Sequence, residues 1–300
     1  MAVTSFSVSP SVAMPIKRKR KSPVFNLVAP ATLLVVFGLL APLLLMFRYS
    51  FNKFVPAELM VSTFTLENYS KFFGDRFYQD VLLVTLGMSA ASTVICLMLG
   101  FPVAYFLARI ASDRWKSVFF IMIVLPLLMG NAVRTAAWML VLGDKGLLST
   151  MAGYVGLSLE KVMYTPTAVL VGLVSVLLPF MIIILLGTIQ SIDSNLEHAA
   201  ESLGARHLTV VRRVLLPLAM PGLLTGTMLC FILAMNAYAT PVLLGGPQFH
   251  MMAPEIYQQV TKAMNWPFGA ALAFALMAVT LVLVVVMTAV TQRHYRKWSE

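Results

Sequence analysis

Residues 191–217 read SIDSNLEHAAESLGARHLTVVRRVLLP and form a long polar stretch between two apolar runs. Ser194 and Glu197 have the S-x-x-E spacing of a capping box, which predicts that a helix begins here. Gly204 is expected to end this helix with a positive φ, as glycine does where the chain must turn left-handed. A helix of about three turns is too short to be stable alone in water, so it needs a partner surface.

One face of the expected helix carries small apolar side chains at positions i, i+3, i+4 and i+7: Leu196, Ala199, Ala200 and Leu203. A short helix with a narrow apolar stripe suits insertion into a groove of another protein. The same periodicity also fits an amphipathic connector that lies on a membrane surface. The pattern alone leaves both interpretations open.

The stretch resembles the E-A-A-x3-G-x9-I-x-L-P loop of the membrane subunits of binding-protein-dependent ABC importers. The matching positions are Ala199, Ala200, Gly204, Val214, Leu216 and Pro217. At the motif's glutamate position the chain has His198, with Glu197 directly before it, so the contact made by that glutamate has two candidates. The resemblance implies a coupling helix seated in the ATP-hydrolysing subunit. The coupling residues that it implies are Glu197, His198, Ala199, Ala200, Gly204 and Pro217.

The composition predicts an all-α membrane protein. Of its 300 residues, 59% are hydrophobic and only 11% are charged, which does not fit a soluble globular domain. A helix needs about 20 apolar residues to cross a bilayer core. Six runs have this character: 26–47, 81–107, 118–142, 165–188, 218–244 and 268–290. The expected coupling helix therefore lies between spans four and five.

The distribution of positive charge predicts the topology. Fourteen of the 22 Lys and Arg residues lie in four segments: 1–22, 109–116, 193–213 and 293–300. The positive-inside rule places these segments, and so both termini, in the cytoplasm. We expect residues 1–22 to be a disordered basic cytoplasmic tail and residues 23–300 to be a six-span permease domain. The net charge of +10 gathers at the ends of apolar runs, which argues against a nucleic-acid-binding face.

Several chemical classes are disfavoured by what the expected spans lack. They contain no Asp, Glu or His, whereas proton-coupled carriers and intramembrane metalloenzymes use buried ionisable groups. The sequence has no HExxH pattern and no GxxxxGK[ST] phosphate loop. We therefore expect no catalytic residue, no metal site and no ATP hydrolysis by this chain. Cys96 and Cys230 lie in apolar runs and are expected to be small buried hydrophobic residues.

Polar residues near two span ends are candidates for the translocation path. Arg134 is the one charged residue within an expected span, and on a straight helix it lies about 24 Å from the cytoplasmic end. It either snorkels to the outer interface or lines the path. The second set lies just before Pro241. These residues either line the path or belong to a helix kink at this proline whose backbone hydrogen bonds are satisfied. The candidates are Asn131, Arg134, Trp138, Asn236, Tyr238 and Thr240. Gly222 and Gly226 have the GxxxG spacing that allows close helix approach.

Three short segments resemble those of polyamine-type permeases: Arg134 to Trp138, the LGGP of 244–247 and the NWP of 265–267. The resemblance implies the permease subunit of a type I ABC importer in a bacterial inner membrane. Its implied partners are a cytoplasmic ATPase dimer, a second permease of the same or another kind, and a periplasmic solute-binding protein. ATP would be used by the ATPase, and no cofactor is expected here. The implied solute is spermidine or putrescine. The alternatives are another small solute, such as an opine or phosphonate, or a stand-alone secondary carrier.

Overall fold

The computed structural model describes residues 24–143, 146–154 and 162–299. The expected N-terminal tail, with its basic block at residues 17–21, lies outside the described residues. The chain divides into two units, Met1–Met46 and Phe47–Glu300. The first contains most of helix α1 (Val24–Tyr49), which is apolar over 22 residues and carries Pro30 and Pro42. The second unit contains all the other helices.

Almost all of the second unit that the structure describes is helical, apart from connections and one isolated bridge between Lys53 and Val61. The helices are α2 (Glu67–Gly74), α3 (Arg76–Tyr105), α4 (Asp113–Val124), α5 (Asn131–Leu142), α6 (Leu147–Tyr154), α7 (Pro166–Ser191), α8 (Asn195–Ser202), α9 (His207–Val210), α10 (Leu216–Met235), α11 (Ala239–Leu244), α12 (Met252–Tyr257) and α13 (Trp266–Ser299). Three π-helical turns, η1 (Phe106–Ile110), η3 (Val211–Leu215) and η4 (Gln258–Lys262), adjoin α3, α10 and α12.

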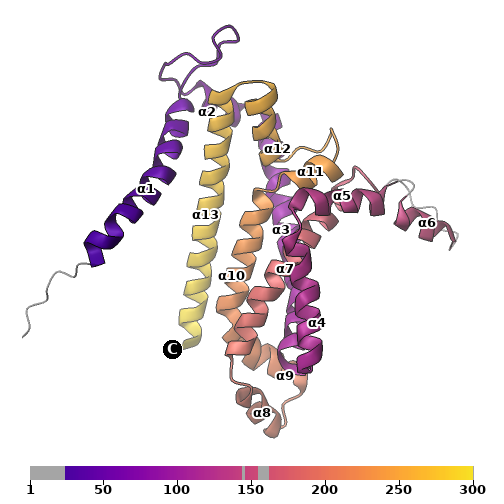
Figure 1. Ribbon diagram of the computed structural model, residues 1–300. Helices are drawn as coiled ribbons and strands as arrows, with labels where there is room; N and C mark the ends of the chain where they lie inside the picture. Colours follow the sequence, from indigo (N-terminus) through magenta and orange to yellow (C-terminus); the bar gives the residue numbers. More distant parts are fainter. Residues whose placement is uncertain (1–23, 144–145, 155–161, 300) are drawn as a thin grey trace, which may run out of the picture. The chain divides into compact units, whose positions relative to one another are not determined.

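Helices α3, α7 and α10 pack against one another as the centre of the bundle (Figure 1). Helix α7 contributes a buried row at a spacing of four residues: Leu173, Leu177, Met181, Leu185 and Ile189. Cys96 and Cys230 are fully buried free thiols in this core, which confirms their prediction as small buried hydrophobic residues. Apolar side chains fill most of this centre, and the hydroxyl groups of Ser89, Ser92 and Thr93 on α3 are buried with them.

The expected close approach at Gly222 and Gly226 is confirmed. A Cβ on Gly222 would overlap the side chain of Thr188 on α7. A Cβ on Gly226 would lie 2.9 Å from the sulfur of Met181 on the same helix. The backbones of α7 and α10 are therefore as close as small residues allow.

Five described helical segments are long and apolar enough to cross a membrane, and a bent pair would supply a sixth. The bent pair covers the span expected at 118–142, and it is broken far more sharply than a proline kink. Helix α4 runs into the 3-10 turn η2 (Leu125–Leu128), and the chain then turns by 103° into α5. Pro126 lies in this turn, and Gly130 before α5 has extended backbone angles.

The expected span 218–244 is also interrupted. Helix α10 ends at Met235, and α11 begins only at Ala239. The break therefore precedes Pro241 instead of being a kink at it. The depth estimated for Arg134 was wrong, because it assumed one straight helix and Arg134 lies on α5, beyond the bend.

Candidate coupling surface and translocation path

Helices α8 and α9 form one end of the bundle, opposite α2, α11 and α12 (Figure 1). Asp193 begins α8: its carboxylate accepts a hydrogen bond from the Asn195 N–H at 2.9 Å. Ser194 already has helical backbone angles and makes no side-chain cap. The predicted capping box was therefore wrong, because Asp193 takes the capping role and Glu197 is engaged elsewhere.

The end of α8 agrees with the sequence prediction. Gly204 has φ +85°, and its N–H donates to the carbonyl of Glu201 at 2.9 Å. The Ala205 N–H donates to the carbonyl of Ala200 at 3.1 Å, which closes the turn. No atom of the described chain lies within 4 Å of the place that a Cβ on Gly204 would take. Gly204 is thus required by backbone conformation and faces open space.

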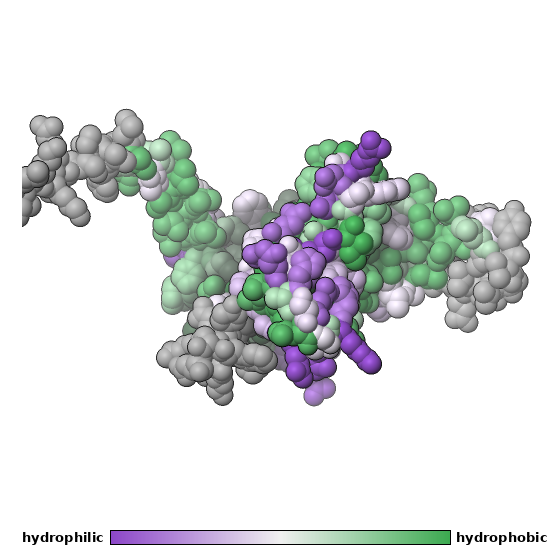
Figure 2. All heavy atoms as spheres, turned by 90° about the horizontal axis from the view of Figure 1, so that it is seen from below, coloured by the Kyte–Doolittle hydropathy of each residue, from purple (hydrophilic) through white to green (hydrophobic). Residues whose placement is uncertain are grey.

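The apolar stripe of α8 is left uncovered by the rest of the described chain. Leu203 is 91% exposed and Leu196 is 47% exposed, and Ala199 is exposed as well. Leu208 on α9 extends the same surface at 78% exposure. Figure 2 views this end and shows hydrophilic side chains gathered over α8 and α9 with apolar side chains among them. Exposed leucines of this kind indicate a contact surface for another molecule.

Beside this surface lie three exposed arginines, Arg206, Arg212 and Arg213. Arg212 and Arg213, with Leu208 and Thr209, line a hollow of about 630 Å³. None of the three arginines forms an ion pair with another residue in the described part of the chain. The basic face is therefore available to an acidic surface outside the chain.

Glu197 points inward from α8 into a polar cluster. Its Oε1 lies 2.7 Å from the Nε of Arg109, and the two side chains are only 8% and 15% exposed. A second Arg109 nitrogen donates to the Ile192 carbonyl at 2.8 Å, just after α7. The Tyr105 hydroxyl donates to Glu197 Oε2 at 3.2 Å. The cluster thus joins the C-terminal end of α3 with η1, the α7–α8 connection and α8.

His198 points the other way, with 73% of its side chain exposed. Its Nδ1 lies 3.6 Å from a carboxylate oxygen of Glu201, whose other oxygen lies 3.5 Å from Nδ1 of His207. The Nε2 of His207 in turn lies 3.2 Å from the Tyr105 hydroxyl. Among the residues searched, no group of His, Cys, Asp and Glu is placed to hold a metal ion. The two candidates for the motif's glutamate position therefore face different sides of α8, one buried and one exposed.

The path candidates lie on α5 and at the α10–α11 break. Arg134 is partly buried, and its guanidinium donates to the carbonyl oxygens of Met129 and, at 3.5 Å, Val176 of α7. Its Nε has no hydrogen-bond partner in the structure. Trp138 packs on the bundle core, whereas Asn131 is exposed at the start of α5. Arg134 is thus tied to α7 and does not simply extend into solvent.

The second set of path candidates has separate partners. The Asn236 side chain donates to the carbonyl of Ile232 at 2.9 Å, and the ring of Tyr238 lies 4.8 Å from that of Tyr257. Thr240 is buried, and its hydroxyl lies 3.3 Å from that of Thr135 on α5. The bond that joins α11 to α5 therefore involves Thr135, which the sequence analysis did not single out.

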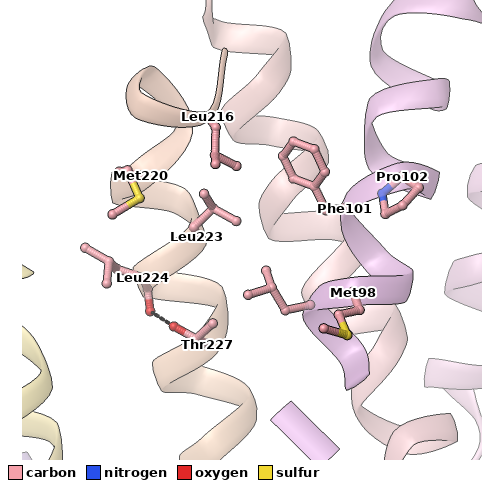
Figure 3. A pocket seen from close by; sticks show the side chains of 9 residues that line it. Met98, Phe101, Pro102, Leu216, Met220, Leu223, Leu224 and Thr227 are labelled. Carbon is pink, nitrogen blue, oxygen red and sulfur yellow. Dashed lines mark hydrogen bonds between the residues drawn. The ribbon is translucent and has the colours of Figure 1, made fainter. Parts of the chain in front are cut away.

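A second hollow, between α3 and α10, is entirely apolar (Figure 3). It measures about 470 Å³ and is lined by Leu97, Met98, Phe101, Pro102, Leu216, Met220, Leu223, Leu224 and Thr227. The Thr227 hydroxyl donates to the Leu224 carbonyl at 2.9 Å, so it offers no free donor to a ligand. This hollow cannot recognise a charged solute by hydrogen bonds.

Residues 84–296 match the family described as the binding-protein-dependent transport system inner membrane component. The chain belongs to this family. The permease is 33% identical to the spermidine/putrescine transport system permease protein PotB of Haemophilus influenzae, over 84% of this chain and 88% of that protein. It is 35% identical to PotB of Escherichia coli K12, over 81% and 88% of the two chains.

Solved structures agree on the fold of the permease. A chain of a bacterial alginate ABC transporter, in complex with its alginate-bound periplasmic protein, superposes with a TM-score of 0.78. The match covers 91% of this chain and 94% of that one at 15% identity, which is evidence for the fold alone. A chain of the MetNI methionine ABC transporter superposes with a TM-score of 0.51 over 73% of this chain and 94% of that one, at 20% identity. The family match and the PotB relatives show that this protein is a multi-pass inner-membrane permease subunit of a binding-protein-dependent importer. Its homologues are permease subunits, which are transport components and not catalysts.

Two residues of the polar cluster were missed by the sequence analysis as site residues. Arg109 counted only as one of the positive charges that set topology, and Tyr105 lay inside an apolar run. No local pattern relates them to Glu197, which is 88 residues from Arg109. One feature of the sequence could have indicated them. Glu197 lies beside the altered motif position, and a glutamate that faced inward there would need a cationic partner.

Proposed function

We propose that the permease belongs to a polyamine importer and forms the path for spermidine or putrescine. The observation that carries this proposal is the 33–35% identity to PotB proteins over 81–84% of the chain. The LGGP and NWP segments, which resemble those of polyamine-type permeases, lie within the same aligned family region. The path is proposed to run past Asn131, Arg134, Trp138, Asn236, Tyr238 and Thr240.

The exposed surface of α8 and α9 is proposed to bind a cytoplasmic ATPase dimer. Three observations support it: the uncovered Leu196 and Leu203, the outward His198, and a basic face without ion partners in the described chain. The contact would involve His198, Ala199, Ala200, Gly204 and Pro217. The complete importer would add a second permease, identical or different, and a periplasmic solute-binding protein. ATP would be used by the ATPase, with no cofactor bound by this chain.

Uptake of labelled spermidine and putrescine by cells that carry the complete importer tests the solute. We expect saturable uptake that depends on the permease and is competed by unlabelled polyamine. The chain is also 32% identical, over 70% of its length, to the ModB molybdenum transport permease of Mycobacterium bovis, so molybdate is the matched competitor. Competition by molybdate and not by polyamines would refute the polyamine assignment.

The proposed topology places both termini and the α7–α10 connection in the cytoplasm. A reporter that is active only in the cytoplasm should work when fused after Ala205 or Trp298 and should be silent after Glu160. The reason is the excess of Lys and Arg around the first two positions. Reporter activity after Glu160 would contradict the proposed orientation.

A further inference from the structure

We infer that Glu197 is an internal positioning residue, which fastens α8 to the end of α3 through Arg109, and is not a contact to the ATPase. The inference rests on the proposed coupling role of α8 and goes beyond it by assigning the mechanical link. Throughout, "the pin" denotes Glu197, Arg109 and Tyr105.

The burial of the pin shows that it faces the permease itself. Glu197 and Arg109 are 8% and 15% exposed and 2.7 Å apart, which is the short distance of a charge-assisted hydrogen bond. A carboxylate held this way has no free face for a partner protein. His198, one residue later, is 73% exposed and is the group that an ATPase would meet.

Arg109 holds both sides of the turn into α8. One nitrogen binds the Glu197 carboxylate, and another binds the Ile192 carbonyl at 2.8 Å. The planar guanidinium therefore fixes the angle between the end of α7 and α8. Tyr105 adds a hydroxyl 3.2 Å from both Glu197 Oε2 and His207 Nε2, which extends the cluster to α9.

The pin connects α8 to α3, one of the three helices at the centre of the bundle. Arg109 lies in η1, directly after α3, and α3 packs along both α7 and α10. Apart from the pin, α8 contacts mainly α9 and η3, which lead into α10. With the pin, a displacement of α8 acts on α3 directly. Since a buried ion pair breaks only at considerable cost, the link is stiff.

The test uses the complete importer, reconstituted with its ATPase, second permease and binding protein. The single reversals Glu197→Arg and Arg109→Glu should each lower binding-protein-stimulated ATPase activity about tenfold or more, because each places like charges together in a buried site. The double variant E197R/R109E should recover activity to within about threefold, since the pair is restored in reverse. The ATPase should co-purify with all three variants.

Lys116→Glu is the matched control. Its ion pair with Asp113 joins exposed side chains at 3.7 Å, so reversal should change activity by less than about twofold. If a single reversal fails to insert, recovery of insertion in E197R/R109E supports the pairing. Glu197→Gln, which keeps the side-chain shape and loses the charge, then provides the activity measurement and should lower stimulated ATPase activity severalfold.

Three results for the reversed variants would each overturn the pin, and a comparison with Gly204→Asp supplies a fourth. In the first, the double variant is no better than the single ones. In the second, Glu197→Arg prevents co-purification of the ATPase while Arg109→Glu does not, which would make Glu197 a partner contact. In the third, stimulated activity per inserted complex is unchanged and only the inserted amount falls, so the pair only stabilises the fold. Loss of activity in Gly204→Asp with normal activity in the reversals would refute the pin alone, whereas normal activity in both Gly204→Asp and Ala200→Glu would refute the coupling role of α8.

Discussion

Replacing Gly204 with aspartate should lower solute uptake per inserted permease about a hundredfold while leaving insertion normal. The backbone at Gly204 has φ +85°, where a residue with a Cβ costs about 1–2 kcal/mol. No described atom lies within 4 Å of the added Cβ, so the permease itself has room for the aspartate. The larger effect on uptake is therefore expected from the contact with the partner protein. An aspartate seated in a partner's cleft would instead lose its hydration, which costs several kcal/mol.

Gly204→Asn is the control that separates charge from backbone strain, because Asn tolerates the left-handed conformation and carries no charge. It should reduce uptake by less than about tenfold. Ala200→Glu should reproduce the loss by filling the stripe of α8, where Ala200 is only partly exposed. Uptake is measured together with the amount of permease in the membrane. Normal uptake by both Gly204→Asp and Ala200→Glu would show that α8 is a plain connector.

The features that follow from local sequence were predicted well. The apolar runs predict the helices because a bilayer-length helix needs only composition and length. Gly204 predicts the end of α8, and its positive φ is confirmed, because a helix stop is decided by one residue's conformational freedom. The GxxxG pair predicts a close helix contact, and the partner helix α7 is supplied by the structure.

The features that depend on distant residues were not predicted. The capping box at Ser194 and Glu197 failed because Arg109, from another helix, competes for the Glu197 carboxylate. The 103° bend after α4 was missed because proline is tolerated in membrane helices, so Pro126 alone does not reveal a break. That Glu197 is buried and His198 exposed likewise depends on which tertiary partner each one has. A motif position fixes a residue's place in the helix but not the neighbour that it meets.

Gly222→Leu should have the largest effect on stability of any substitution at this interface. Even a Cβ at position 222 would lie 2.5 Å from the Cβ of Thr188 and overlap its hydroxyl, so α7 and α10 would have to separate. Overpacking of this kind lowers the free energy of unfolding by about 1–3 kcal/mol. For a leucine placed at a contact between two backbones, we expect a loss at or above the upper end of this range. We expect most of the permease to be misfolded, which size-exclusion chromatography in detergent measures as a loss of the folded fraction. The thermal unfolding midpoint of the remaining folded protein should also fall.

Gly187→Leu is the matched control on α7, because no atom of the described residues lies within 4 Å of its Cβ position. It should leave the folded fraction and the unfolding midpoint nearly unchanged. The swap Thr188→Gly with Gly222→Ala moves the small residue to the opposite helix and should be more stable than Gly222→Ala alone, although a glycine inside a helix costs about 1 kcal/mol. If Gly222→Leu and Gly187→Leu fold equally well, α7 and α10 do not meet at Gly222. In that case the close contact of α7 and α10 at Gly222 would be absent, and it could not transmit motion from the α8 end into the bundle.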